Sequence, residues 1–419
     1  MKRLLTSIVA AALAASVMAA DKVTITVANQ LNEARDGELA EVNANIIKSK
    51  LDGTGTIVIL DADGKEVASQ LTYDGKIVFP VGVAAKGKSI YYAKYGNPSQ
   101  YEPKVYGRHY PERVDDIAWE NDRVAFRTYG PALQRNGERA WGYDVWNKRT
   151  SRLVVEERYK SELNPDMQKA ISHLRSIGQD NLADDVYNAI SYHVDHGTGM
   201  DCYKVGPTLG CGTAAFIVDG KIAYPRCWQK HEILDRGPLR FTFKVIYGTE
   251  KIDGQNIVET RIISLDAGSH LNKVTVSYEG MNKEMPLAVG IVVHNENPNA
   301  YVLNAQDGYM GYEDLGDPTQ YKEKYRDVQN RDFGKIYTGT VFCQKVGEMK
   351  FQSESGLPGA TGHILAITQL SPQNPSYTYY FGSGWNRNTE TYVENLTDWE
   401  EYLDGFAKCA NKPLKVSVK

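Results

Sequence analysis

Charged and aromatic side chains gather in residues 106–149, on what we predict to be two adjacent strands. Strand alternation within residues 123–129 and 142–148 puts a set of polar side chains on one side of each strand. The turn signal Asn136-Gly137 predicts that the two strands form a hairpin. Because guanidinium, ammonium and carboxylate groups are costly to bury unpaired, we interpret this face as the floor of a site for an anionic, ring-shaped ligand. The residues assigned to ligand binding are Arg123, Arg127, Asp144, Trp146 and Lys148, with Arg113 and Asp201 from flanking segments and Tyr129 beside Arg127.

A glycine-rich segment, residues 191–212, holds a second group of reactive side chains. His193, Asp195 and His196 lie close together, and Asp201 follows. Two neutral imidazoles and a carboxylate can act as acid and base or bind a divalent metal. Their spacing matches no standard metal motif, so a metal at these three residues is the weaker interpretation and we expect no cofactor. The alternative is that these side chains only hold the loop together by hydrogen bonds.

His109 is a third candidate for proton transfer. Arg108 and Arg113 flank it, and cationic surroundings favour the neutral imidazole, which is the basic form. The alternative is a surface histidine at the start of the second domain. Together, the predicted catalytic residues are His109, Tyr129, Tyr192, His193 and His196.

The first residues are typical of a secretory signal. Lys2 and Arg3 precede an apolar run, and Val17-Met18-Ala19 is a small-residue cleavage site. We therefore predict a signal peptide over residues 1–19 and a periplasmic or secreted protein without membrane insertion, since the apolar run is too short to span a bilayer. Loss of Lys2 and Arg3 changes the formal charge from −4 to about −6. An acidic chain with no basic run argues against nucleic acid as a partner.

Five cysteines are present, namely Cys202, Cys211, Cys227, Cys343 and Cys409. An exported protein can form disulfides, but an odd count leaves at least one thiol free. Cys202 and Cys211 could form a disulfide across a glycine-rich turn, and buried free thiols are the alternative.

Short runs of alternating hydrophobic residues fill most of the chain. Runs in residues 22 to about 98 predict a small immunoglobulin-like β-sandwich, with a linker at Gly96–Ser99. Longer runs beyond it predict a large antiparallel β-sandwich. Helices are expected at 164–178 and 181–192, and after a capping box at Thr397-Asp-Trp-Glu400. The expected domains are residues 20–98, an accessory β-sandwich, and residues 101–419, the catalytic domain.

Four motifs resemble the DUF4861 family of exported bacterial proteins, namely YPERVDDIAWENDRVAFRTYGPAL, GYDVWNKR, SYHVDHGTGMDCYKVGPTLGCG and YTYYFGSGWNR. The resemblance covers the chain from about residue 100 to the C-terminus. It implies a galactose-mutarotase-like β supersandwich, which agrees with the strand pattern. It also implies a setting in polysaccharide degradation, often of glycans that contain uronic acids or rhamnose, and thus an oligosaccharide as partner.

This setting points to β-elimination at a uronic acid by a lyase or dehydratase. The reaction needs a group that neutralises the carboxylate, a base for the C5 proton and an acid for the leaving oxygen. Arg123 or Arg127 could neutralise the carboxylate. One of the three histidines could act as base, and Tyr129 or Tyr192 as acid or base.

Other functions stay open at this point. A glycoside hydrolase would pair Glu120 with Asp144 or Asp201, while a mutarotase or epimerase and a glycan-binding protein without catalysis are further alternatives. The sequence has no Gly-x-Ser-x-Gly elbow, P-loop, dinucleotide fingerprint or His-Glu-x-x-His motif. These absences argue against phosphoryl transfer and nicotinamide chemistry.

Overall fold

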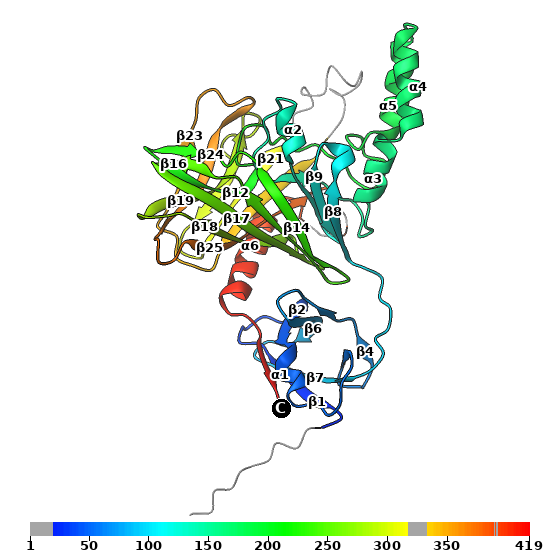
Figure 1. Ribbon diagram of the computed structural model, residues 1–419, viewed down its shortest axis with the longest axis vertical. Helices are drawn as coiled ribbons and strands as arrows, with labels where there is room; N and C mark the ends of the chain where they lie inside the picture. Colours follow the sequence, from blue (N-terminus) through cyan, green and yellow to red (C-terminus); the bar gives the residue numbers. More distant parts are fainter. Residues whose placement is uncertain (1–19, 317–332, 389, 391–392) are drawn as a thin grey trace, which may run out of the picture.

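The computed structural model describes residues 20–316, 333–388, 390 and 393–419, and the predicted signal peptide, residues 1–19, lies outside them. A small and a large β domain follow each other along the chain (Figure 1). The predicted mostly β fold with large antiparallel sheets is confirmed. No helix among the described residues is long and apolar enough to cross a membrane.

The small domain packs two antiparallel sheets around an apolar core. Its elements are β1 (Val23–Ala28), β2 (Arg35–Asn43), α1 (Ala44–Lys48), β3 (Ile57–Leu60), β4 (Glu66–Val67), β5 (Gln70–Leu71), β6 (Lys76–Val83), β7 (Lys88–Tyr95) and β26 (Lys415–Val418). The sheets have the orders β26-β1-β7-β3-β4 and β2-β6-β5. Because the C-terminal strand β26 pairs with β1 and packs Val416 and Val418 on this core, residues 415–418 do not belong to the large domain as predicted.

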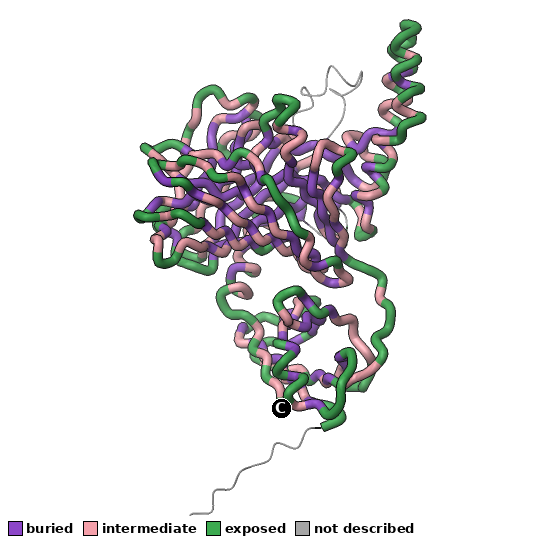
Figure 2. Tube along the Cα trace, in the orientation of Figure 1, coloured by how far each residue is buried: buried purple, intermediate pink, exposed green. Residues whose placement is uncertain are grey.

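The large domain is a sandwich of two antiparallel sheets. The smaller sheet runs β13 (Lys221–Ala223), β12 (Cys211–Val218), β19 (Met285–His294), β24 (Ala360–Leu370), β23 (Glu348–Ser353). The larger runs β14 (Trp228–Arg236), β15 (Arg240–Tyr247), β17 (Gln255–Asp266), β18 (Leu271–Glu279), β25 (Ser376–Trp385), β22 (Lys335–Phe342), β21 (Tyr309–Leu315), β20 (Tyr301–Asn304), with β16 (Glu250–Ile252) paired to β17. Buried side chains such as Val289 and Phe381 fill the space between them, which Figure 2 shows as the most buried part of the molecule.

A four-stranded sheet lies against one side of this sandwich and carries the candidate site. It has the order β11 (Asp144–Trp146), β10 (Ala125–Thr128), β9 (Asp116–Asn121), β8 (Val105–Tyr110), with the short helix η1 (Pro111–Arg113) between β8 and β9. Ile117, Trp119 and Phe126 face the main core. The opposite face is covered by α3 (Val155–Glu162) and by residues 191–201, and the pair α4 (Pro165–Ser176) and α5 (Asp180–Ile190) projects beyond it (Figure 1).

The helices at 165–176 and 180–190 confirm two predictions, and the Asn164 side chain caps the first by accepting hydrogen bonds from Asp166 and Met167. The two predicted strands do pair, as β10 with β11, and residues 136–137 form a turn, but the connection is longer than a simple hairpin because α2 (Pro131–Arg135) precedes the turn. Asn136 caps the C-terminus of α2, and Gly137 follows with a φ of 87°, as is common after a helix.

The last helix, α6 (Leu396–Asn411), covers the outer side of β21 and β22. It starts before the predicted capping box. Asn395 caps it by accepting a hydrogen bond from Asp398 N at 3.1 Å, and Asp398 accepts in return from Glu394 N at 2.9 Å. The reciprocal pattern that was assigned to Thr397 and Glu400 is therefore made by Asn395 and Asp398.

Candidate active site

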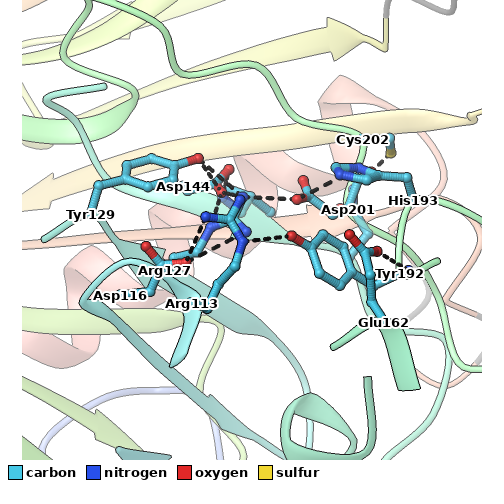
Figure 3. Close-up of polar contacts among 12 residues, drawn as sticks. Arg113, Asp116, Arg127, Tyr129, Asp144, Glu162, Tyr192, His193, Asp201 and Cys202 are labelled. Atoms are coloured by element: carbon cyan, nitrogen blue, oxygen red, sulfur yellow. Dashed lines mark hydrogen bonds and ion pairs between the residues drawn. The ribbon is translucent and has the colours of Figure 1, made fainter. Parts of the chain in front are cut away.

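The outer face of the four-stranded sheet holds a buried group of charged and aromatic side chains. Strand register places Arg127 opposite Asp144 on β11 and Ala118 on β9. Because side chains alternate along a strand, Arg127, Asp144 and Asp116 project from the same face. We call the whole group the Arg127 cluster, and its members are Arg113, Asp116, Arg127, Tyr129, Asp144, Tyr192 and Asp201 (Figure 3).

Arg127 is the centre of the cluster and is buried. Its Nε and Nη2 bind Asp144, and Nη2 also lies 2.8 Å from Asp201 Oδ2 and 3.0 Å from the Tyr129 hydroxyl. The Tyr129 hydroxyl donates in turn to Asp144 Oδ2 at 2.7 Å. The guanidinium also lies 4.9 Å from the centre of the Trp146 ring. Two carboxylates and two aromatic rings thus fix the orientation of Arg127 and neutralise its charge.

Two buried atoms of the cluster have no hydrogen-bond partner among the residues that the structure describes, Arg127 Nη1 and Asp116 Oδ1. The other oxygen of Asp116 accepts a hydrogen bond from the Tyr159 hydroxyl at 3.0 Å and lies 4.0 Å from Arg127 Nη1. Buried polar atoms without a partner are uncommon in native proteins and are frequent at functional sites. The cluster therefore contains one buried donor and one buried acceptor without a partner among the described residues.

Three carboxylates share the cluster with two guanidiniums, so burial acts strongly on their pKa values. Burial raises the pKa of Asp116 to about 6, against the attraction of Arg127 and Arg113. Burial also raises the pKa of Asp144 and of Asp201, although the positive charge of Arg127 acts to lower both pKa values. Asp116 thus exchanges its proton near neutral pH, as a general base or acid requires.

Arg113 forms the partly exposed edge of the cluster, and the buried Tyr192 lies behind it. The Arg113 side chain is 25% exposed, its Nε donates to the Tyr192 hydroxyl at 3.1 Å, and its Nη1 lies 3.9 Å from Asp116 Oδ2. Burial raises the pKa of Tyr192, so its hydroxyl stays protonated at neutral pH. Glu162 on α3 fixes this segment by accepting hydrogen bonds from Tyr192 N at 3.0 Å and from the Ser191 hydroxyl at 2.9 Å.

The binding floor predicted on β11 is internal packing. Trp146 packs against Tyr159 and Tyr192 with no exposed surface. Lys148 Nζ lies 2.7 Å from Glu120 Oε2, and neither side chain is exposed. The reason is α3, whose first residue Val155 donates its N–H to the other Glu120 oxygen at 2.7 Å and so brings the helix over the sheet. The predicted ligand contacts of Trp146 and Lys148 are corrected accordingly.

Arg123 and His109 lie outside the cluster, although the sequence grouped them with it. Arg123 is in the turn between β9 and β10, where Asn121 Oδ1 accepts from its N–H, and its Nη1 donates to Glu390 O at 3.0 Å. His109 projects from the opposite face of β8, with its ring 4.3 Å from that of His231 and its Nε2 3.3 Å from Asp115 Oδ1. Neither is placed to act on a ligand at Arg113.

The histidine-rich loop divides between two tasks. His193 joins the cluster edge, with Nδ1 2.9 Å from Asp201 O, and its role as a base stays a prediction. His196 Nε2 lies 3.1 Å from Ser191 O. Asp195 accepts from the N–H groups of Gly197 and Gly199 and pairs with Arg149, as expected of residues that hold a loop together. In the described part of the chain no three His, Cys, Asp or Glu side chains are grouped to hold a metal ion.

Asp116 was not among the residues predicted from the sequence, although strand alternation could have identified it. It stands two positions before Ala118 and four before Glu120, and therefore on the same face as Arg127. All five cysteines are free thiols, so Cys202 and Cys211 are the buried thiols of the alternative interpretation and do not form a disulfide.

The protein therefore has two β-sandwich domains, and the four-stranded sheet beside the larger one carries a buried ionic cluster. The chain belongs to the family described as "Domain of unknown function (DUF4861)", whose model matches residues 27–416. The match therefore includes the small N-terminal domain, which corrects the predicted extent of the resemblance. This agrees with the pairing of the C-terminal strand to that domain.

Among related proteins, "Uncharacterized protein P7" of Formosa agariphila is 27% identical over 322 residues, which are 75% of this chain and 70% of the relative. Similar solved structures include a protein in the glycosyl hydrolase family 38 from Enterococcus faecalis, at 10% identity and a TM-score of 0.47, with 96% of this chain and 48% of the other covered. An alpha-mannosidase from Enterococcus faecalis V583 matches at 10% identity and a TM-score of 0.44, over 96% of this chain and 46% of the other. This chain spans about half the length of these two structures.

Proposed function

We propose that this chain is an exported enzyme that acts on uronic-acid-containing oligosaccharides by β-elimination. The observation that carries the proposal is the edge of the Arg127 cluster. There a partly exposed guanidinium, Arg113, lies beside Asp116, a buried carboxylate whose pKa is about 6 and whose Oδ1 has no partner among the described residues. The family resemblance adds the expectation of a polysaccharide substrate.

The geometry favours Arg113 over Arg123 and Arg127 for recognition of the proposed substrate. Arg127 is already bound by Asp144 and Asp201 and is buried, whereas the Arg113 side chain is 25% exposed. In the proposed reaction the Arg113 guanidinium pairs with the uronate carboxylate and stabilises the enolate that forms from it. Arg127 supports this step by holding positive charge near Asp116.

Proton transfer then needs one base and one acid. Asp116 Oδ1 removes the proton from the carbon next to the carboxylate, and the electron pair forms the new double bond as the bond to the leaving oxygen breaks. The Tyr192 hydroxyl, which Arg113 holds at 3.1 Å, donates its proton to that oxygen. Transfer of the proton from Asp116 to the tyrosinate through solvent restores both groups.

The hydrolase alternative has less support from the geometry. It needs two carboxylates free to reach a sugar, but Glu120 is bound to Lys148, and Asp144 and Asp201 are bound to Arg127. A glycan-binding protein without catalysis would also use Arg113, but it would not need a base. An enzyme would turn over the oligosaccharide and depend on Asp116 to do so, whereas a binding protein would bind it without turnover.

A pH profile is the first expected result. Asp116 must be ionised to act as base, so kcat/KM should rise with pH through about 6 and level off above it. Because burial raises this pKa, Asp116 becomes protonated as pH falls below about 6, and the protonated form cannot act as a base. Initial rates over a pH series, with folding checked by circular dichroism, measure this. A rate that falls from pH 5 to 7 would assign Asp116 to a different role.

Substrate recognition is tested at Arg113. Replacement by Gln should raise KM for a uronate oligosaccharide about tenfold or more, because a charge-assisted bidentate contact is lost. Arg135→Gln is the matched control, since the Arg135 side chain is 69% exposed and lies on α2. Equal KM values for the two variants would exclude Arg113 as the carboxylate ligand.

A further inference from the structure

A cavity of about 310 Å³ lies apart from the Arg127 cluster, between β12 and β13 of one sheet and β16 and β17 of the other. Its lining changes with depth. Arg226 and Lys251 are exposed at the mouth, Trp141 and Tyr224 are half-buried, and Glu259 is buried. Cationic, aromatic and acidic residues therefore follow each other inward, which is unlike the uniformly apolar lining of a packing defect.

The aromatic pair makes a preformed wall. The rings of Trp141 and Tyr224 are 4.8 Å apart and inclined at 39°. The Tyr224 hydroxyl donates to Glu354 Oε2 at 2.6 Å, which fixes the ring. Because both rings are only half-buried, they offer apolar surface to a flat ligand that still carries polar groups at its edge. The face of a pyranose ring has this character.

The buried part of the cavity lining includes the carboxylate of Glu259, which is bound by the buried Arg261. Arg261, which has no exposed surface, donates from Nε to Glu259 Oε1 and from Nη1 to the Tyr143 hydroxyl at 3.1 Å. Tyr278 also reaches Oε1, at 3.5 Å. Within the described residues no hydrogen bond involves Glu259 Oε2, so this oxygen is available to accept from ligand hydroxyl groups.

The charge of the lining argues for a neutral ligand. Arg226 and Lys251 carry two positive charges, and Glu250 and Glu259 carry two negative charges, so they cancel. The volume lies at the lower end of the range for small-molecule sites, which is about 300–1,000 Å³, and so suits a single ring. An acidic sugar would meet the Glu259 carboxylate at the floor, whereas a hydroxyl-rich neutral sugar satisfies it.

Neighbouring residues connect the cavity to the cluster without merging them. Tyr143 binds Arg261 behind the cavity, and Asp144, the next residue, binds Arg127. Successive side chains of an extended segment point to opposite faces.

We infer that this cavity is a binding site for one neutral pyranose unit, stacked on Trp141 and Tyr224 and hydrogen-bonded to Glu259. The site does not depend on the elimination chemistry proposed for the Arg127 cluster. It would hold a neutral sugar of the same glycan that is bound at the Arg127 cluster, or a neutral sugar of a different glycan.

Titration calorimetry of the full chain with neutral gluco-, manno- and galacto-trisaccharides tests the inference. At least one of them should bind, and Trp141→Ala and Tyr224→Ala should each weaken it about tenfold or more, as truncation of an aromatic anchor does. Tyr73→Ala is the control, because Tyr73 is an exposed tyrosine of the small domain and should leave the affinity unchanged. Thermal unfolding of each variant checks that it is folded.

Two outcomes would overturn the inference. One is that none of the neutral trisaccharides binds, or that binding is the same in both aromatic variants as in the unmodified chain. The other is that the cavity prefers an acidic sugar, seen as binding of a uronate trisaccharide that Trp141→Ala abolishes and Arg113→Gln leaves intact. Because Arg113→Gln reports only on the Arg127 cluster, a failure here is distinguishable from a failure of the proposed elimination.

Discussion

Replacement of Asp116 by Asn is expected to lower kcat on a uronate oligosaccharide by about 10²–10⁴-fold, the usual contribution of a positioned general base. The amide has the shape of the carboxylate and can still accept from the Tyr159 hydroxyl, which lies 3.0 Å from Asp116 Oδ2. The substitution removes the ability to take a proton, together with the negative charge near Arg113 and Arg127. Initial rates at saturating substrate measure the effect, and KM should change little because Arg113 still binds the substrate carboxylate.

Stability separates this effect from simple damage. Because burial raises the pKa of Asp116, its ionised form is disfavoured in the folded state. A neutral amide should therefore leave the free energy of unfolding at neutral pH unchanged or slightly higher. Asp63→Asn, at an exposed turn of the small domain, is the matched control. If Asp116→Asn retains full activity while it remains folded, Asp116 is not the base.

Replacement of Arg127 by Met should destabilise the protein by about 3–5 kcal/mol, as expected when one partner of a buried ion pair is removed. Asp144 and Asp201 would keep their buried carboxylates without the guanidinium that now binds both. The loss should shrink as pH falls, because the pKa values of these carboxylates are raised and the protonated acids need no cation. Urea unfolding at neutral and acidic pH measures this.

A triple variant makes the Arg127 result specific. Adding Asp144→Asn and Asp201→Asn to Arg127→Met removes the unpaired charges and should restore part of the lost stability. Arg152→Met is the control, since that side chain is 68% exposed and should change stability by no more than about 0.5 kcal/mol. If Arg127→Met and Arg152→Met are equally stable, the cluster is not held by its central guanidinium.

The sequence could predict which residues share a face but not what covers that face. Period-two alternation correctly grouped Arg127 with Asp144 and Trp146, because strand geometry alone decides it. The covering helix α3 was not recognised, so Trp146 and Lys148 were assigned to a ligand and are in fact internal. His109 was misplaced for a related reason: it is one residue out of phase with Arg108 and Tyr110, whose side chains face α3.

Long-range pairing was also beyond the reach of local patterns. The strands of the small domain were predicted from residues 22 to about 98, yet β26 at the far end of the chain completes its sheet. Nothing in the four residues of that strand specifies β1 as its neighbour. The packing of Val416 and Val418 on the small core decides it. The predicted N-cap of α6, Thr397, is two residues too late. Asn395 and Thr397 are both suitable capping residues, and the Asn395 side chain is the one that accepts the capping hydrogen bond.

Digestion of uronate oligosaccharides by the unmodified protein decides whether it is a β-eliminating enzyme. Ultraviolet absorbance and product mass are followed together, because elimination creates a conjugated double bond and adds no water. Absorbance should rise in step with product, no product should gain the mass of one water, and Asp116→Asn should abolish both signals. Products that gain water without absorbance, or no products from any uronate oligosaccharide, would contradict it.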